Sequence, residues 1–128
     1  VYIHWGTENE AEIDWAQEKQ AAQIAQAGAD LIVGDHPHCL QKMALVNGVP
    51  VIYSLGNFWF NSKDLDTGLL QVTISMTGAF TPKVQFIPAR QQNCETYLAA
   101  GSEKERILNE MRSLSTGITL DADGVLVQ

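Results

Sequence analysis

Residues 28 to 38 read Gly-Ala-Asp-Leu-Ile-Val-Gly-Asp-His-Pro-His, and this stretch decides the fold of the chain. Asp30 to Val33 is short and largely apolar, as in a strand that is buried in a parallel sheet. The preceding segment, Ile13 to Ala27, is rich in strong helix formers, and Gly28 stands where a residue with positive φ would end a helix. A helix that leads into a buried strand is the repeating unit of α/β layer folds. We therefore expect an α/β fold.

The middle of the chain predicts strands that are joined by tight turns. Met43 to Val46 and Val49 to Tyr53 flank the dipeptide Asn47-Gly48, which readily takes the positive φ values of a type I′ turn. A hairpin is therefore expected there. Two further strands, each ended by a turn signal, are expected at Gly68 to Met76, before Thr77-Gly78, and at Lys83 to Ile87, before Pro88.

The last part of the chain predicts a second helix and a hairpin. Residues 102 to 114 have helical character, with Ser102 as the expected N-cap and Glu105 completing a capping box. A hairpin is expected around Asp123-Gly124. The polar stretch from Gln91 carries no such signal.

Length and charge limit the classes of protein to which this chain can belong. A chain of 128 residues is long enough for one domain with a core of its own. Its formal net charge of −7 and the lack of a basic cluster exclude nucleic acid as an expected partner, because such binding depends on lysine and arginine. The chain starts within an expected strand and without Met, so we interpret it as a piece of a longer protein.

The two cysteines, Cys39 and Cys94, are too few for a disulfide framework and lack the spacing of metal ligands. We expect buried free thiols, with a bridge between the two as the alternative. The sequence does not distinguish between the two redox states.

All three histidines lie in two short clusters, His4-Trp5-Gly6 and His36-Pro37-His38, each directly after an expected strand. Carboxyl ends of neighbouring parallel strands meet at one edge of a sheet. Residues i and i+2 of an extended segment project to the same side, and Pro37 favours extended backbone at His36. Imidazole is the commonest protein metal ligand. We therefore expect the rings to gather around a metal ion or phosphate, with ordinary hydrogen-bonded histidines as the alternative.

Other polar residues near these clusters have two interpretations each. Glu8 is either a base or orienting carboxylate, or simply an acid at the approach to a helix. Asp35 is either a further ligand or, since an extended chain would point it away from His36, an acceptor that orients a histidine or a simply solvated side chain. Asn57 either stabilises a turn or contacts a ligand. Phe58, Trp59 and Phe60 are expected to pack in the core or at an edge, and Gly6 and Gly34 to let the backbone approach a bound group.

Three motifs occur together in a characteristic order: His4-Trp5-Gly6-Thr7-Glu8, Gly34-Asp35-His36-Pro37-His38 and Tyr53-Ser54-Leu55-Gly56-Asn57-Phe58. In these motifs the chain resembles the C-terminal half of the bacterial CapA domain, found in poly-γ-glutamate capsule biosynthesis proteins that are related to the calcineurin-like metallophosphoesterases. The resemblance covers residues 1–90. Residues 91–128 are expected to form a helix and hairpin extension of the same domain.

The resemblance implies a four-layer α/β/β/α sandwich with mixed sheets, two main helices and a two-metal centre at the strand ends. His4, His36 and His38 match metal ligands, with His4 and His36 serving one ion and His38 the other. The implied cofactors are divalent ions, Mn, Fe, Zn or Mg. Glu8 and His36 are the candidate catalytic residues, and Asn57 and Trp5 the candidate substrate-binding residues.

The chain departs from the family pattern in three respects. Asn9 stands where the family has Tyr, and Asp35 where His is frequent. The Asp-x-His, Gly-Asp and Gly-Asn-His ligands of the superfamily belong to the N-terminal half and are not in this chain. We therefore expect the fragment to hold metal weakly or not at all, to be inactive alone, to require the missing N-terminal half as partner, and to dimerise through exposed strand edges.

The expected function follows from this resemblance. The longer protein would act on poly-γ-glutamate or another anionic polymer at the cell surface, extracytoplasmic or membrane-anchored, by metal-activated attack of water on a phosphoester or amide. A non-catalytic module for polymer binding or assembly is the main alternative, and a phosphoesterase of small substrates is a third.

Overall fold

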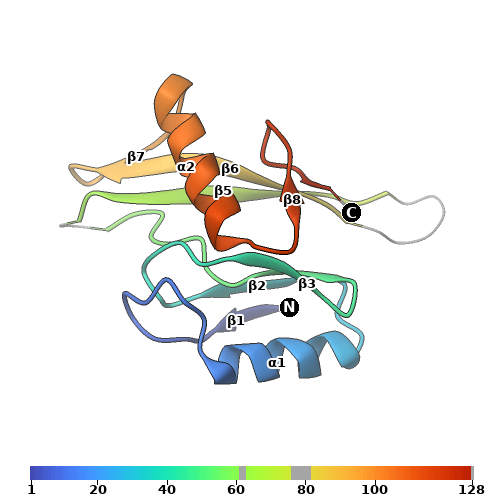
Figure 1. The fold of residues 1–128 in the computed structure, drawn as a ribbon. Helices are drawn as coiled ribbons and strands as arrows, with labels where there is room; N and C mark the ends of the chain where they lie inside the picture. Colours follow the sequence, from blue (N-terminus) through green and yellow to red (C-terminus); the bar gives the residue numbers. More distant parts are fainter. Residues whose placement is uncertain (61–62, 76–81, 128) are drawn as a thin grey trace.

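The computed structural model describes residues 1–60, 63–75 and 82–127 (Figure 1). It shows an α/β fold with mixed sheets and two helices, as expected from the sequence. Across the described residues, no helix is both long and apolar enough to cross a membrane. The elements are β1 (Tyr2–His4), α1 (Trp15–Gln26), β2 (Ile32–Asp35), β3 (Met43–Val46), β4 (Val49–Ile52), β5 (Leu65–Thr73), β6 (Lys83–Gln92), β7 (Glu95–Leu98), α2 (Gly101–Leu114), β8 (Thr119–Leu120) and β9 (Leu126–Val127).

The first sheet has the order β1-β2-β4-β3, in which β1, β2 and β4 are parallel and β3 is antiparallel to β4. The predicted turn between β3 and β4 is confirmed, because Asn47 and Gly48 have φ values of 53° and 80°. The register pairs His4 with Asp35. The carboxyl ends of β1 and β2 therefore lie side by side.

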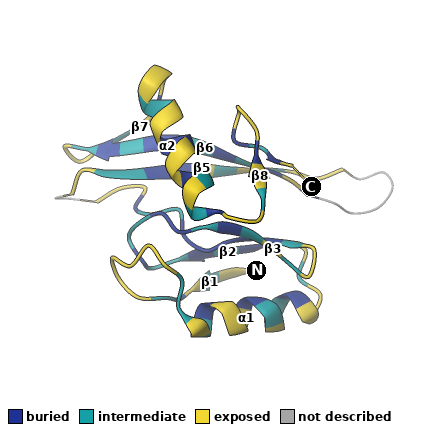
Figure 2. Ribbon diagram, viewed as in Figure 1, coloured by how far each residue is buried: buried dark blue, intermediate teal, exposed yellow. Residues whose placement is uncertain are grey.

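Helix α1 covers one face of this sheet (Figure 1). Asp14 caps it through a capping box with Gln17, and Gly28 follows its end with a φ of +97°. Its buried positions include Ala21 and Ala25, while its outer face is exposed (Figure 2). These alanines pack in a core with Trp5, Ile32, Val51 and Tyr53.

The other face of the sheet is covered by β6 and α2. Strands β5, β6 and β7 form an antiparallel sheet in that order, and α2 packs against β6 (Figure 1). Met43 and Ile52 of the first sheet join the second core. Its other members include Phe86 of β6 and Ile107, Leu108 and Met111 of α2.

The end of β6 and the strand after it differ from expectation. Strand β6 continues through Pro88 to Gln92, so the expected end at Pro88 is wrong. Proline fits there because the pairing of β6 with β7 starts only at Ala89, while the Pro88 carbonyl still accepts from Ala99 N at 3.0 Å. Strand β7 has no apolar alternation and was not predicted.

Two terminal features were predicted with different success. The Ser102 N-cap is wrong, since α2 starts at Gly101 after Ala100, and no side chain caps it. The closing hairpin is confirmed by the pairing of β8 with β9, and Gly124 has a φ of +80°.

Strand β5 starts earlier than expected, at Leu65. The expected end of that strand at Met76 and the turn signal at Thr77-Gly78 lie outside the described residues.

Candidate metal centre

The three histidine rings lie close together at the ends of β1 and β2. The ring centroids of His4 and His36 are 4.4 Å apart, and those of His36 and His38 are 5.9 Å apart. The parallel pairing of β1 with β2 produces this convergence, because it brings the two histidine clusters to one edge of the sheet.

The backbone of the second cluster is not extended, contrary to expectation. His36 and His38 have φ values of 93° and 61°, in the left-handed region that residues other than glycine seldom adopt. The expectation that Pro37 holds His36 in an extended conformation is therefore wrong. Residues in such conformations gather at functional sites, where the surrounding structure offsets their strain.

His4 and His38 each have one ring nitrogen engaged by an oxygen that only accepts hydrogen bonds. Nδ1 of His4 lies 2.8 Å from Asp35 Oδ1, and Nδ1 of His38 lies 2.7 Å from Asn57 Oδ1. In both pairs Nδ1 must therefore donate its proton. The other nitrogen, Nε2, then carries the lone pair that binds a metal ion.

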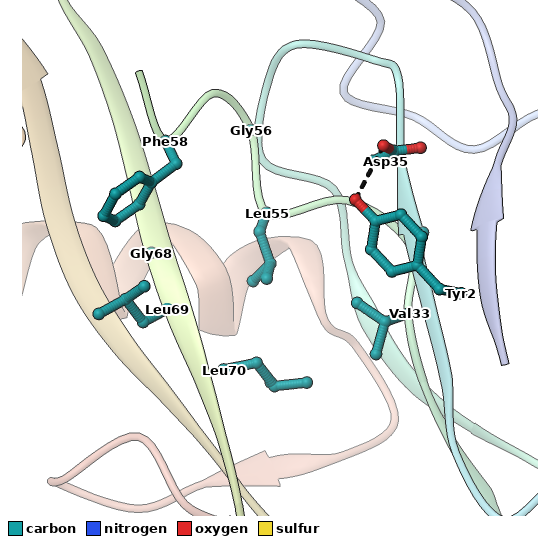
Figure 3. Close-up of a pocket in the computed structure, with 10 residues that line it drawn as sticks. Tyr2, Val33, Asp35, Leu55, Gly56, Phe58, Gly68, Leu69 and Leu70 are labelled. Carbon is teal, nitrogen blue, oxygen red and sulfur yellow. Dashed lines mark hydrogen bonds between the residues drawn. The ribbon is translucent and has the colours of Figure 1, made fainter.

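Asp35 lies between two donors. Its Oδ2 accepts a hydrogen bond from the Tyr2 hydroxyl at 2.8 Å, while Oδ1 binds His4 (Figure 3). The hydrogen bond to the carboxylate, together with desolvation, raises the pKa of Tyr2. Of the two interpretations of Asp35, the geometry favours the acceptor that orients a histidine.

Asn57 is buried in the turn that follows β4. Its Oδ1 is engaged by His38, and its Nδ2 has no hydrogen-bond partner among the described residues. The Phe60 ring lies against the His38 ring, with the two centroids 5.5 Å apart. The oxygen that would contact a substrate thus already orients a histidine, and only the amide nitrogen remains to meet a ligand.

Glu8 lies beside the second histidine cluster. Its carboxylate and one ring nitrogen each of His36 and His38 all lie within 4.8 Å of one another. Asn9 N donates to Pro37 O at 2.7 Å, which joins the loop that carries Glu8 to the turn that carries the two histidines.

Two buried glutamines, Gln17 and Gln41, support the Glu8 loop, and sequence reasoning missed both. Gln41 Nε2 donates to Glu10 O at 2.9 Å, and Gln17 Nε2 donates to Gln41 Oε1 at 2.8 Å. Both side chains are fully buried. Their burial could not be predicted from the sequence, because Gln17 lies in a helix rich in glutamine and Gln41 lies in the irregular segment between β2 and β3.

Trp5 lies in the core, not at the edge of the site. It stacks on Tyr53 with ring centroids 5.2 Å apart, and its Nε1 donates to Tyr53 O at 2.9 Å. Its side chain thus offers almost no surface to the predicted substrate. Gly34 leaves room for this indole, and Gly6 leaves room for the Gln17 side chain, so the protein itself occupies the space that was expected for a bound group.

The aromatic triplet after Asn57 is exposed, so the expected packing in the core is wrong. Phe58 and Trp59 are 55% and 65% exposed. Trp59 Nε1 donates to Cys94 O at 2.9 Å, and Thr96 Oγ1 donates to Phe58 O, so the β6–β7 turn holds the segment in place. The first bond holds the Trp59 side chain and the second holds the Phe58 main chain, so both aromatic residues are kept at the protein surface.

The cysteines differ from each other in exposure. Cys39 is a half-buried free thiol, which excludes the bridge to Cys94. Burial raises the pKa of the Cys39 thiol, an effect that Glu10 reinforces and Lys63 opposes. Cys94 is exposed, contrary to the expectation of two buried thiols.

Comparison with known proteins places these motifs in a family. The family described as bacterial capsule synthesis protein PGA_cap matches residues 1–62, which hold all the candidate site residues. The chain is 31% identical over 115 residues, 87% of its length, to capsule biosynthesis protein CapA of Bacillus anthracis. The chain belongs to the CapA family. It is also 38% identical over 81 residues, 61% of its length, to PGA biosynthesis protein CapA of Bacillus subtilis (strain 168).

The match to these CapA proteins covers only part of each. It spans 28% of the B. anthracis protein and 21% of the B. subtilis protein. The activity, substrates and partners of a whole CapA protein therefore enter below as proposals.

Proposed function

We propose that this CapA-family chain carries the histidine ligands of a metal-dependent, hydrolase-like centre that acts in capsule biosynthesis. The observation that carries the proposal is the convergence of His4, His36 and His38, two of which have Nδ1 engaged by a protein oxygen. Metal-ligating histidines commonly have such partners, because the partner fixes the tautomer and the orientation of the ring.

The donor set fits a divalent cation. The three imidazoles, through Nε2 in His4 and His38, are ligands for Mn, Fe or Zn, and carboxylate ligands from the missing N-terminal half would also suit Mg. A divalent ion held by these residues would supply the activation of water for attack on a phosphoester or an amide bond.

The chain's own groups have distinct roles in this proposal. Asp35 and Asn57 hold the rings of His4 and His38, and Glu8 moves a proton to or from the reacting group, since His36 is occupied as a ligand. The substrate is an anionic polymer such as poly-γ-glutamate, in line with the PGA biosynthesis named in the B. subtilis relative. A protein with a net charge of −7 needs local cations to bind a polyanion, which favours a metal centre over a bare surface.

The complete centre belongs to a longer protein. A bridged pair of ions needs more ligands than this chain offers, and the proposal places the rest in the N-terminal half of a four-layer sandwich, in which residues 1–90 and 91–128 form one domain. The fragment alone is then inactive. The longer protein acts outside the cytoplasm or at the cell surface, where a capsule polymer is exported.

The test changes His36 and His38 together to alanine in the longer protein. We expect bound metal to fall by at least tenfold and hydrolysis to fall by about 100-fold or more, because the ligands are lost. Elemental analysis measures the bound metal. Hydrolysis is measured with γ-glutamyl polymer, phosphomonoesters and phosphodiesters as substrates. Glu12→Gln, which changes an exposed acid of the neighbouring loop, is the control.

Retention of both metal and activity in the double variant would contradict the proposal. A longer protein that binds γ-glutamyl polymer equally well after chelation, and turns over none of the substrates, would instead support the non-catalytic module.

A further inference from the structure

We infer that Glu8 is a metal ligand, and that Glu8, His36 and His38 hold one divalent cation within this chain alone. The inference rests on the proposed function in one respect, that the histidines bind metal, and it changes Glu8 from a proton-transfer group into a ligand. It also departs from the pairing of His4 with His36 that the family resemblance implies. The three donor groups of the cluster lie within 4.8 Å of one another, and His4 is not among them.

The distances suit coordination after a small closure. Ligand atoms at about 2.0 to 2.2 Å from an ion lie roughly 3 to 3.5 Å from each other, so an ion would draw the donors together by about 1 Å. Glu8 is exposed and can move by that amount through its side-chain rotamers. His38 is already oriented by Asn57 through Nδ1 and offers Nε2.

The backbone around Glu8 is fixed so that the carboxylate faces the histidine turn. Asn9, directly after Glu8, has a φ of 63°, and its N–H donates to Pro37 O, between the two histidines. Lys63 Nζ donates to Asn9 Oδ1 at 2.7 Å. Gln41 holds the loop from the buried side through Glu10 O. Hydrogen bonds from residues that are distant in sequence therefore hold the loop that carries Glu8 in position.

The charge of the cluster favours a divalent cation. One carboxylate and two neutral imidazoles give the site a charge of about −1, and such a two-histidine, one-carboxylate set leaves open positions on Fe, Mn, Co or Zn. Among the residues described, no lysine or arginine forms an ion pair with Glu8. The carboxylate is thus available to a ligand.

The test titrates the metal-free 128-residue chain with Co²⁺, followed by visible absorption, and with Zn²⁺, followed by calorimetry. We expect one ion per chain. Glu8→Gln keeps the shape of the side chain but removes its charge, and should weaken binding by at least tenfold. Glu10→Gln, an exposed acid two residues away in the same loop, is the matched control and should stay within twofold.

Each outcome has a distinct meaning. Metal binding that is equal in Glu8→Gln and wild type overturns the ligand role of Glu8, while a loss in His36→Ala and His38→Ala still supports the histidine centre. A larger loss in His4→Ala than in Glu8→Gln places the ion elsewhere and also overturns the inference. If wild type binds no ion, this inference fails, whereas the proposed function is decided by metal and activity in the longer protein. Thermal unfolding without metal shows whether each variant is folded.

Discussion

At the scale of the residue, Gly34 shows how closely the site and the core are joined. A Cβ atom at this position would lie 2.1 Å from Trp5 Nε1 and 2.3 Å from Tyr53 O. These two atoms form the hydrogen bond that holds Trp5 in the core behind His4. The glycine that precedes Asp35 and His36 is therefore required by packing within the protein.

We predict that Gly34→Ala lowers the free energy of unfolding by about 3 kcal/mol, because neither the indole nor the Tyr53 backbone can yield without breaking their bond. Gly28→Ala is the control. It has open space around the new methyl group and a φ of +97°, so it should cost only about 1 to 2 kcal/mol of backbone strain. Urea unfolding measures both, and an equal loss in the two variants would refute the role of the Trp5–Tyr53 contact.

At the scale of the element, an ionic cluster attaches α2 to β5 and β6. Asp66 of β5 accepts two hydrogen bonds from Arg106 of α2, at 2.6 and 2.8 Å, and one from Arg90 of β6 at 2.7 Å. Arg106 first, and Arg90 after it, hold the pKa of Asp66 down at about 2, against the opposing effect of its burial. Burial, followed by the nearby Asp66, raises the pKa of Glu110 on the same helix.

The lowered pKa of Asp66 gives stability that is fully present above its ordinary value of 3.8 and is lost as the pH falls toward about 2. We predict that Asp66→Asn lowers the free energy of unfolding by about 2 kcal/mol at pH 7, and that this difference disappears near pH 2. The raised pKa of Glu110 acts in the opposite direction, so its contribution grows as the pH falls.

Denaturant unfolding at the two pH values measures this effect. Asp123→Asn is the control, since Asp123 is exposed and lies 3.5 Å from Lys104 Nζ, and its change should stay within about 0.5 kcal/mol. A difference between Asp66→Asn and wild type that is independent of pH would contradict the ionic origin.

At the scale of the whole molecule, the two sheets leave an apolar cavity between them. Its volume is about 300 Å³, and it lies between β1 and β2 on one side and β5 on the other (Figure 3). Strand β1 is at the edge of the first sheet and β5 at the edge of the second. Tyr2 and Leu69, which line the cavity from these strands, are 71% and 39% exposed. Exposed apolar surface beside strand edges favours association with another chain or segment.

We predict that the isolated chain self-associates and that Leu69→Lys weakens this association by at least tenfold, because it places a charge in the apolar cavity. Leu45→Lys is the matched control, since Leu45 is 38% exposed and lies on β3, at the opposite edge of the first sheet. Sedimentation equilibrium measures the association. A monomer at all concentrations, or an equal effect of both variants, would refute the prediction.

The sequence by itself determined the features that depend on a few adjacent residues. The helix that ends before Gly28, the Asn47-Gly48 hairpin, and the placement of both histidine clusters after parallel strands could all be predicted, since each depends on local propensity or on the rule for strand ends. Only the tertiary structure decided the remaining features. The left-handed backbone of His36, the support of the Glu8 loop by Gln41, and the orientation of His38 by Asn57 depend on partners that are distant in sequence. Such partners meet only when the sheets and helices pack, because buried polar groups must then find their hydrogen bonds across the whole fold.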